Sequence, residues 1–231
     1  MNPATLEEKK KALTPAAVKK KVAVIGGGIG GMEAARVAAL RGHSVTLYEK
    51  SGELGGVFIA AAAPSFKEKD KMLIAWYIRQ LEKLKVDIRL DSEITPENLS
   101  SLDADEIIIA TGAKCRSLRA DGADRENVMN AVEYLRGYKE TGENVVIVGG
   151  GLTGCEIAYD AVLKGKKPVI VELMDDILNV PNLCAANSNM LREILRTTGS
   201  LFTHRRKPQP LPMREWRLRG RKGKRRFPPT A

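Results

Sequence analysis

Long hydrophobic runs are missing from this sequence of 231 residues. Its longest apolar stretch, VFIAAAAP at residues 57–64, is far shorter than the roughly 18 residues that a membrane-spanning helix needs. The first 20 residues carry charges throughout and contain no apolar segment, so they do not resemble a secretory signal peptide. We therefore expect a cytoplasmic protein with no membrane partner.

Cysteine and histidine are also scarce. The three cysteines, Cys115, Cys155 and Cys184, are far apart and have no metal-ligand spacing, which argues against a disulfide framework, a zinc site and an iron–sulfur cluster in this chain. Isolated thiols of this kind are typically buried. His43 follows a predicted helix end and His204 lies in a basic segment, so we expect both at the surface and predict no catalytic residue.

Positive charge is distributed unevenly. The net charge is +10, yet residues 197–231 hold 11 Lys and Arg against one acid, and the residues before them hold 27 of each sign. This tail could be a cationic arm that binds nucleic acid or an acidic membrane surface, or a solvated, disordered segment. The abrupt change of composition near residue 197 favours a third interpretation, out-of-frame translation of a longer gene.

Apolar periodicity predicts an α/β protein. Short β-branched runs that end at glycines are typical of buried parallel strands, and apolar residues at helical spacing follow them. Residues 1–20 are polar and Lys-rich, and read as a linker. The predicted strands are 21–26, 44–49, 86–90 and 105–112, the last buried on both faces, and the predicted helices include 66–85, 130–137 and 187–196.

A whole supersecondary unit is repeated. Shifting residues 22–49 by 123 positions lays them over residues 145–172, with 11 of 28 positions identical. Each copy has an apolar strand, a G-x-G-x-x-G turn, a helix, and an acid 23 residues after the first glycine at the end of the next strand. The fold predicted is therefore α/β with tandem Rossmann-like units, two dinucleotide-binding domains of which the second is incomplete, followed by the basic tail.

Each position of this motif has a physical role. Gly26 and Gly149 permit a tight turn, Gly28 and Gly151 let the backbone approach a pyrophosphate, and Gly31 and Gly154 let the helix lie close to the strand. The phosphates would meet free N–H groups at a helix N-terminus. Glu49 and Glu172 are placed to accept hydrogen bonds from a ribose 2′-hydroxyl. Because Glu172 and the acids after it would repel a 2′-phosphate, NADH is favoured over NADPH.

Two dinucleotide sites in tandem predict a cofactor relay. The usual pairing is FAD in the first unit and NADH in the second, with hydride passing from nicotinamide to flavin. The first unit, LGG at 54–56, IIIATGA at 107–113 and VVIVGGGLTGCEIA resemble the two-dinucleotide-binding-domain flavoproteins. More narrowly, they are similar to the C-terminal half of the 2-enoate reductase, 2,4-dienoyl-CoA reductase and trimethylamine dehydrogenase family.

The resemblance implies roles for particular residues. Gly26, Gly28, Gly31 and Glu49 would hold the adenosine side of FAD, and Gly55, Gly56, Thr111 and Gly112 would be loop residues that touch it. Gly149, Gly151, Gly154, Glu156 and Glu172 would serve NADH. In complete relatives, electrons continue through an iron–sulfur cluster to FMN in a barrel domain. A separate FMN-barrel protein or an oligomer is therefore a candidate partner, whereas nucleic acid is not an expected one.

This sequence also departs from the family pattern. It has no C-x-x-x-x-C pair near the first unit, so the disulfide-reductase branch is not expected. The predicted domains are an FAD-binding domain at 21–142 that lacks its C-terminal part, a partial NAD-binding domain at 143–196 and the tail at 197–231. An incomplete sheet exposes edges and apolar faces, so poor solubility is predicted. An inactive fragment or interaction module that keeps the fold is the alternative to an oxidoreductase.

Overall fold

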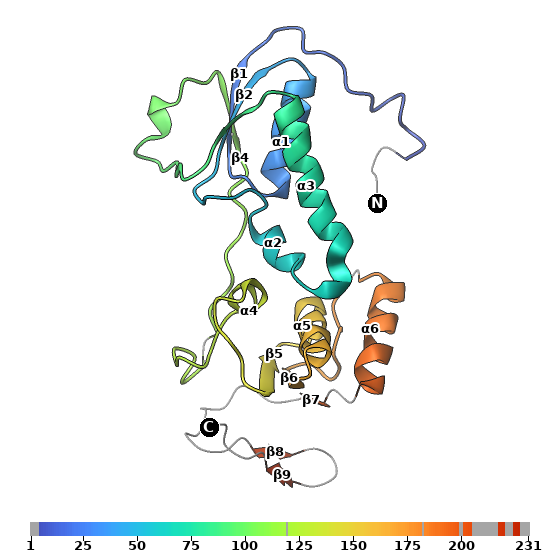
Figure 1. Ribbon diagram of the computed structural model, residues 1–231. Helices are drawn as coiled ribbons and strands as arrows, with labels where there is room; N and C mark the ends of the chain where they lie inside the picture. The colour runs from blue at the N-terminus through green and yellow to red at the C-terminus, as the bar shows by residue number, and fades with distance from the viewer. Residues whose placement is uncertain are drawn as a thin grey trace. The chain divides into compact units, whose positions relative to one another are not determined.

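The chain divides into two compact units, Met1–Lys114 and Cys115–Ala231 (Figure 1). This computed structural model describes residues 5–118, 120–181 and 183–198, together with three short strands further along the chain. Each unit contains a parallel sheet with helices packed on it. The α/β fold class and the tandem Rossmann-like units predicted from the sequence are confirmed.

The sheet of the first unit has the order β3-β2-β1-β4, with every neighbouring pair parallel. In its register, Val24 lies opposite Leu47 on one side and Ile108 on the other. The apolar residues of neighbouring strands therefore line the same face. The strands are β1 (Lys21–Ile25), β2 (Ser44–Tyr48), β3 (Asp87–Arg89) and β4 (Glu106–Ile109).

Two helices of this unit, α1 and α3, pack together on one face of the sheet (Figure 1). Met32 of α1, Leu47 of β2 and Leu81 of α3 are fully buried between these layers. Helix α1 ends at Leu40, and Gly42 follows with φ +93°, as predicted for a helix-terminating glycine. The helices are α1 (Ile29–Leu40), α2 (Val57–Ala61) and α3 (Glu68–Lys83), with 3₁₀ turns at Ser65–Lys67 and Leu99–Ser101.

Strand β4 is exposed, and the prediction that it is buried on both faces is wrong. The side chains of Ile107, Ile108 and Ile109 are 41%, 36% and 71% exposed. Among the described residues β4 pairs with β1 alone, so its outer edge is free. Three isoleucines in sequence indicate a strand made for burial, but burial also depends on neighbours that come from distant parts of a chain.

We expect this free apolar edge to cause self-association. An exposed edge strand rich in isoleucine is a template for pairing with another chain, and a lysine at such an edge blocks that pairing. Ile109→Lys should therefore reduce the light scattering of concentrated protein several-fold. Leu163→Lys is the matched control, because Leu163 is 50% exposed but ends a helix. Equal effects of the two substitutions would contradict an edge-specific mechanism.

The second unit has a sheet of order β5-β6-β7, again parallel. Strand β7 falls inside the segment 197–231 that was predicted to be a tail, and its backbone pairs with β6. Of this predicted tail, residues 199–200, 205–216, 220–223 and 227–231 lie outside the described residues, so the disorder predicted for them stays a prediction. The elements are α4 (Ala131–Arg136), β5 (Asn144–Val148), α5 (Leu152–Leu163), β6 (Lys167–Glu172), α6 (Ala185–Thr197) and β7 (Leu201–His204), with an antiparallel pair β8 (Arg217–Arg219) and β9 (Lys224–Arg226).

The two compact units divide between Lys114 and Cys115, before α4, whereas the boundary at residue 142 between the FAD- and NAD-binding domains stays a prediction. Helix α4 belongs with the second unit because the Tyr134 hydroxyl donates to Oδ2 of the buried Asp160 at 3.0 Å. The ammonium group of Lys164 lies 2.6 Å from the same oxygen. Together these contacts satisfy a buried carboxylate and fix α4 on α5.

The cysteines only partly follow expectation. Cys155 is buried, whereas Cys115 and Cys184 are exposed, so the prediction of burial is wrong for two of the three. No group of three or more His, Cys, Asp and Glu side chains in the described part of the chain could hold a metal ion.

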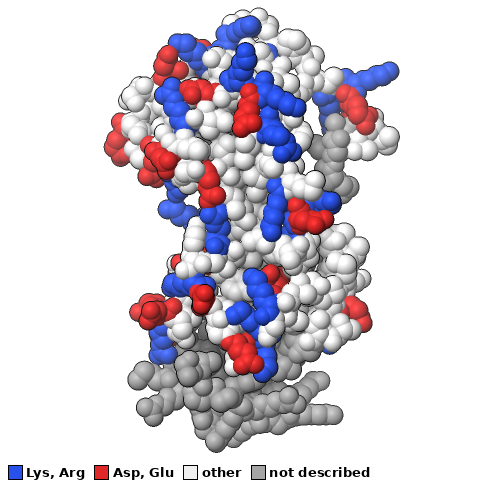
Figure 2. All heavy atoms as spheres, in the orientation of Figure 1, with Lys and Arg blue, Asp and Glu red and all other residues white. Residues whose placement is uncertain are grey.

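Figure 2 shows both charge signs interspersed over the described residues on the face in view. No helix of the described residues has the length and apolar character to cross a membrane.

Candidate functional site

The first glycine turn connects β1 to α1 with a backbone that requires glycine at two places. Gly26 adopts φ +108°, and a Cβ atom there would overlap the carbonyl oxygen of Ala110. At Gly31, a Cβ would overlap the carbonyl oxygen of Gly26 itself. Helix α1 therefore lies directly against the turn, which is the role predicted for the third glycine of the motif.

The N-terminus of α1 is open toward solvent. Gly28 is the N-cap residue, and no described side chain caps the helix there. A Cβ atom at Gly28 would meet no described atom within 4 Å. Free N–H groups at a helix N-terminus next to open space form a site suited to an anion such as a pyrophosphate.

The LGG segment lies beside this turn, although it is more than 25 residues away in the sequence. The N–H of Gly55 donates to the carbonyl of Gly27 at 2.8 Å, and Gly28 and Gly55 form an isolated β-bridge. A Cβ on Gly56 would come within 3.1 Å of the Gly28 Cα atom. The structure thus brings together Gly26, Gly28, Gly31, Gly55 and Gly56.

Thr111 and Gly112 follow β4 at the same end of the sheet. A Cβ on Gly26 would lie 3.2 Å from the Thr111 Cα atom, so Thr111 adjoins the turn. Gly112 is exposed with φ +72° and would meet no described atom within 4 Å of an added Cβ. Contact of either residue with a flavin stays a prediction.

Glu49 is tied to the first turn by its carboxylate. One oxygen accepts the N–H of Gly27 at 2.6 Å, and the other accepts both the N–H and the hydroxyl of Ser51 at 2.8 Å. Burial opposes ionisation of this side chain, which is 7% exposed, but the hydrogen bonds outweigh burial and lower the pKa of Glu49 below its usual value. The carboxylate therefore fixes the turn in its open geometry.

Glu49→Gln is expected to destabilise the protein by about 2 kcal/mol near neutral pH. Both carboxylate oxygens accept N–H bonds, so the amide group of Gln must face a donor and leave it unsatisfied. A group with a lowered folded-state pKa contributes stability above its unfolded pKa and loses it as pH falls. The difference between the two proteins should therefore shrink below about pH 4.5, which is the unperturbed value.

Urea unfolding at several pH values measures this effect. Glu82→Gln on the exposed face of α3 is the matched control and should change the free energy of unfolding by less than about 0.5 kcal/mol. A destabilisation by Glu49→Gln that stays constant down to pH 3 would contradict a role for the ionised carboxylate.

The second glycine turn repeats the backbone of the first. Gly149 has φ +105°, Gly151 is an extended N-cap that no described side chain caps, and a Cβ on Gly154 would overlap the Gly149 carbonyl oxygen. A Cβ on Gly151 would meet no described atom within 4 Å. One difference is that Gly149 has open space where Gly26 meets Ala110, because no described strand pairs with the outer edge of β5.

Glu172 occupies the position of Glu49 in this second turn. Its carboxylate accepts the N–H of Gly150 at 2.5 Å and the N–H of Met174 at 2.8 Å. Glu156 lies half-buried on α5. Its counterpart in the repeat, Glu33, binds Arg36 through two hydrogen bonds of 2.7 and 2.8 Å. A cofactor-binding role for Glu156 stays a prediction.

A positive charge pairs with the acids that follow the second turn, and the sequence did not predict this. The residues directly after Glu172 include only acids among their charged side chains, but α6 carries Arg192, which forms an ion pair with Asp176. The two residues are 16 positions apart, so no local spacing indicates their contact. The helix predicted at 187–196 includes Arg192, but its pattern indicates no partner for this side chain.

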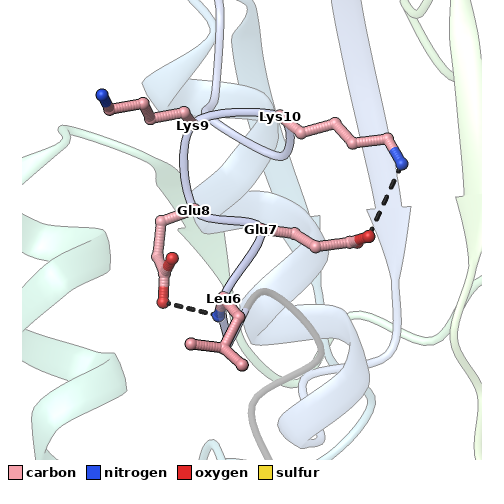
Figure 3. A pocket seen from close by; sticks show the side chains of 5 residues that line it. All are labelled: Leu6, Glu7, Glu8, Lys9 and Lys10. Carbon is pink, nitrogen blue, oxygen red and sulfur yellow. Dashed lines mark hydrogen bonds and ion pairs between the residues drawn. The ribbon is translucent and has the colours of Figure 1, made fainter.

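A surface hollow at the N-terminal segment shares no lining residue with either turn. It is lined by Leu6, Glu7, Glu8, Lys9 and Lys10, all close together in the sequence (Figure 3). Glu8 accepts the N–H of Leu6 at 3.0 Å, and Lys10 and Glu7 form an ion pair at 3.5 Å. Because the side chains of such a short exposed segment can satisfy one another, nothing here favours a ligand site.

Comparison with known proteins agrees with this geometry. A family model described as pyridine nucleotide-disulphide oxidoreductase matches residues 20–208. Cinnamate reductase of Clostridium sporogenes is 46% identical over 197 residues, which are 85% of this chain and 29% of that protein. NADH oxidase of Thermoanaerobacter brockii is 43% identical over 166 residues, or 70% of this chain and 26% of that protein.

A solved structure leads to the same family. The complex of 2-naphthoyl-CoA reductase with 2-naphthoyl-CoA superposes with a TM-score of 0.83 at 30% identity, covering 90% of this chain and 32% of that one. The chain thus spans less than a third of the length of these three relatives. The resemblance to flavin-dependent enoate reductases predicted from the sequence is confirmed, and the chain belongs to the pyridine nucleotide-disulphide oxidoreductase family of FAD- and NAD(P)-binding proteins.

Proposed function

We propose that this chain binds FAD at the first glycine turn and NADH at the second, and that it passes hydride from NADH to FAD. The observation that carries this proposal is the repeated backbone of the two turns. Both have a glycine at positive φ and an N-cap with no described side-chain cap. In both, a carboxylate accepts the N–H of the residue after the first glycine, Gly27 or Gly150. A turn that served only to connect a strand and a helix would not need all three features twice.

The residues present fit these cofactors. Gly28 and Gly151 leave room for phosphate oxygens beside the helix N-termini. Glycine at position 56 keeps the first of these sites open, because a Cβ there would press against the Gly28 backbone. Glu49 and Glu172 are held by backbone N–H groups at the end of the adjacent strand, and a carboxylate keeps further lone pairs for ribose hydroxyls. When bound, the two cofactors supply the hydride chemistry, and the chain contributes binding and orientation.

Preference for NADH over NADPH is part of the proposal. A 2′-phosphate would be placed near the carboxylate of Glu172, and two neighbouring negative groups repel one another. The proposed acceptor of the electrons from FAD is an FMN-binding barrel, carried by a partner protein. A cytoplasmic location, where NADH is available, also belongs to this proposal.

Flavin absorbance of the purified chain tests the proposal most directly. After incubation with FAD and gel filtration, the protein should be yellow, and anaerobic NADH should bleach the flavin band. An artificial acceptor such as ferricyanide should then be reduced at the expense of NADH. A colourless protein would exclude the first half of the proposal, and a yellow protein that NADH does not bleach would exclude the second half.

A further inference from the structure

The ion pair between Asp176 and Arg192 lies at the second glycine turn. Asp176 follows β6 and Arg192 comes from α6, and the guanidinium donates a hydrogen bond to the carboxylate. The other Asp176 oxygen accepts the N–H of Ile177 at 2.8 Å. The side chains of Asp176 and Arg192 are 48% and 24% exposed, so a ligand at the surface of this unit can reach them.

Backbone contacts fix this pair near the turn. The N–H of Leu178 donates to the carbonyl of Gly150 at 2.6 Å. A Cβ on Gly150 would lie 2.8 Å from the Ile177 side chain and 3.1 Å from a carboxylate oxygen of Glu172. Asp176 is two residues before Leu178, which bonds directly to the turn. It lies on the same side of the turn as Glu172, the acid that is proposed to contact the ribose.

Cys155 connects the charge of Arg192 with the turn. The Cys155 thiol donates to the carbonyl of Gly150 at 3.3 Å. Burial raises the pKa of this thiol to about 12, and the positive charge of Arg192 opposes the rise. The charge of Arg192 therefore acts on a thiol that is bonded directly to the Gly150 turn.

We infer that Asp176 sets the cofactor preference of this site by holding Arg192 away from the adenosine ribose. An arginine near the ribose of a dinucleotide accommodates a 2′-phosphate, because the guanidinium matches phosphate in charge and geometry. Arg192 is neutralised by Asp176, so the charge that meets the ribose is the Glu172 carboxylate. This inference rests on the proposed function, namely that the second unit binds a pyridine nucleotide.

The core of the second unit is formed by apolar side chains and does not include this pair. Leu191 and Leu195 of α6 are 6% and 1% exposed and belong to the core of this unit. Asp176→Asn is a near-isosteric change that keeps the acceptor for the Ile177 N–H and removes the charge that holds Arg192. We therefore expect this variant to fold.

The experiment compares the dissociation constants of NADH and NADPH, with 5′-AMP and adenosine 2′,5′-bisphosphate as probes of the adenosine end alone. The unchanged chain should favour NADH. In Asp176→Asn, the ratio of the NADPH to the NADH dissociation constant should fall about tenfold, because one charge-assisted contact to phosphate becomes available. The double variant Asp176→Asn with Arg192→Gln should restore the original ratio, and circular dichroism establishes that each variant is folded.

The outcomes separate this inference from the proposed function. If the unchanged chain binds neither dinucleotide, the proposed function fails, and the inference fails with it. If NADH binding persists but Asp176→Asn leaves the ratio within about twofold, the inference alone is overturned. A gain in NADPH binding that survives the loss of Arg192 would also overturn it, because another group would then be binding the phosphate.

Discussion

Gly31→Ala is expected to weaken FAD binding at least about 100-fold, whereas Gly30→Ala leaves it within about threefold of the unchanged chain. The two glycines are neighbours in the first turn of α1, and alanine raises the helix propensity at both. They differ in what a Cβ atom meets. At Gly31 it overlaps the carbonyl oxygen of Gly26, and at Gly30 it meets no described atom within 4 Å.

The overlap at Gly31 is with backbone, so no side-chain rotation can relieve it. Helix α1 must move away from the turn, and its N–H groups then lose their alignment with the proposed phosphate position. We expect the FAD dissociation constant to rise at least about 100-fold, and the free energy of unfolding to fall by about 1 to 3 kcal/mol through overpacking. Flavin retention on gel filtration and urea unfolding measure the two effects. Equal flavin retention by the two variants would contradict the role assigned to Gly31.

The turns were predictable from the sequence because their determinants are local and occur twice. Gly26 and Gly149 were assigned to tight turns, and both have φ above +100°. Gly31 and Gly154 were assigned to close helix packing, and a Cβ at either position would overlap a backbone oxygen. The acids were placed correctly at the strand ends, but their bonds to Gly27 and Gly150 could not be read from spacing alone.

Contacts between distant segments account for what the sequence did not reveal. The isoleucines of β4 have the composition of a buried strand, but their exposure depends on which elements lie next to the strand. The unit boundary depends on the bond between Tyr134 and Asp160 across 26 residues. The pair of Asp176 and Arg192 likewise joins a loop to a helix that begins nine residues later. None of these contacts leaves a periodic signal in the chain.

The second large effect is expected at Gly154, where alanine should separate the two proposed half-reactions. A Cβ at this position overlaps the Gly149 carbonyl oxygen, as at Gly31 in the first unit. Gly154→Ala lies in the second unit, so the chain should retain its flavin colour and reduction by dithionite. The rate at which NADH bleaches the flavin should fall at least about 30-fold, because displacement of α5 moves the N–H groups that are proposed to bind the pyrophosphate.

The two substitutions should nevertheless differ in their structural cost. Gly26 is backed by the Ala110 carbonyl of the segment after β4, so the first turn has no room to move when alanine replaces Gly31. A Cβ at Gly149 would meet no described atom within 4 Å, so the second turn can shift and relieve part of the overlap. Gly154→Ala should therefore lower the free energy of unfolding less than Gly31→Ala does.

Thr153→Ala, at an exposed neighbouring position of α5, is the control and should leave NADH bleaching within about twofold. If Gly154→Ala lost its flavin as readily as Gly31→Ala, the assignment of one cofactor to each turn would be wrong, since damage confined to the second turn would then have reached the first.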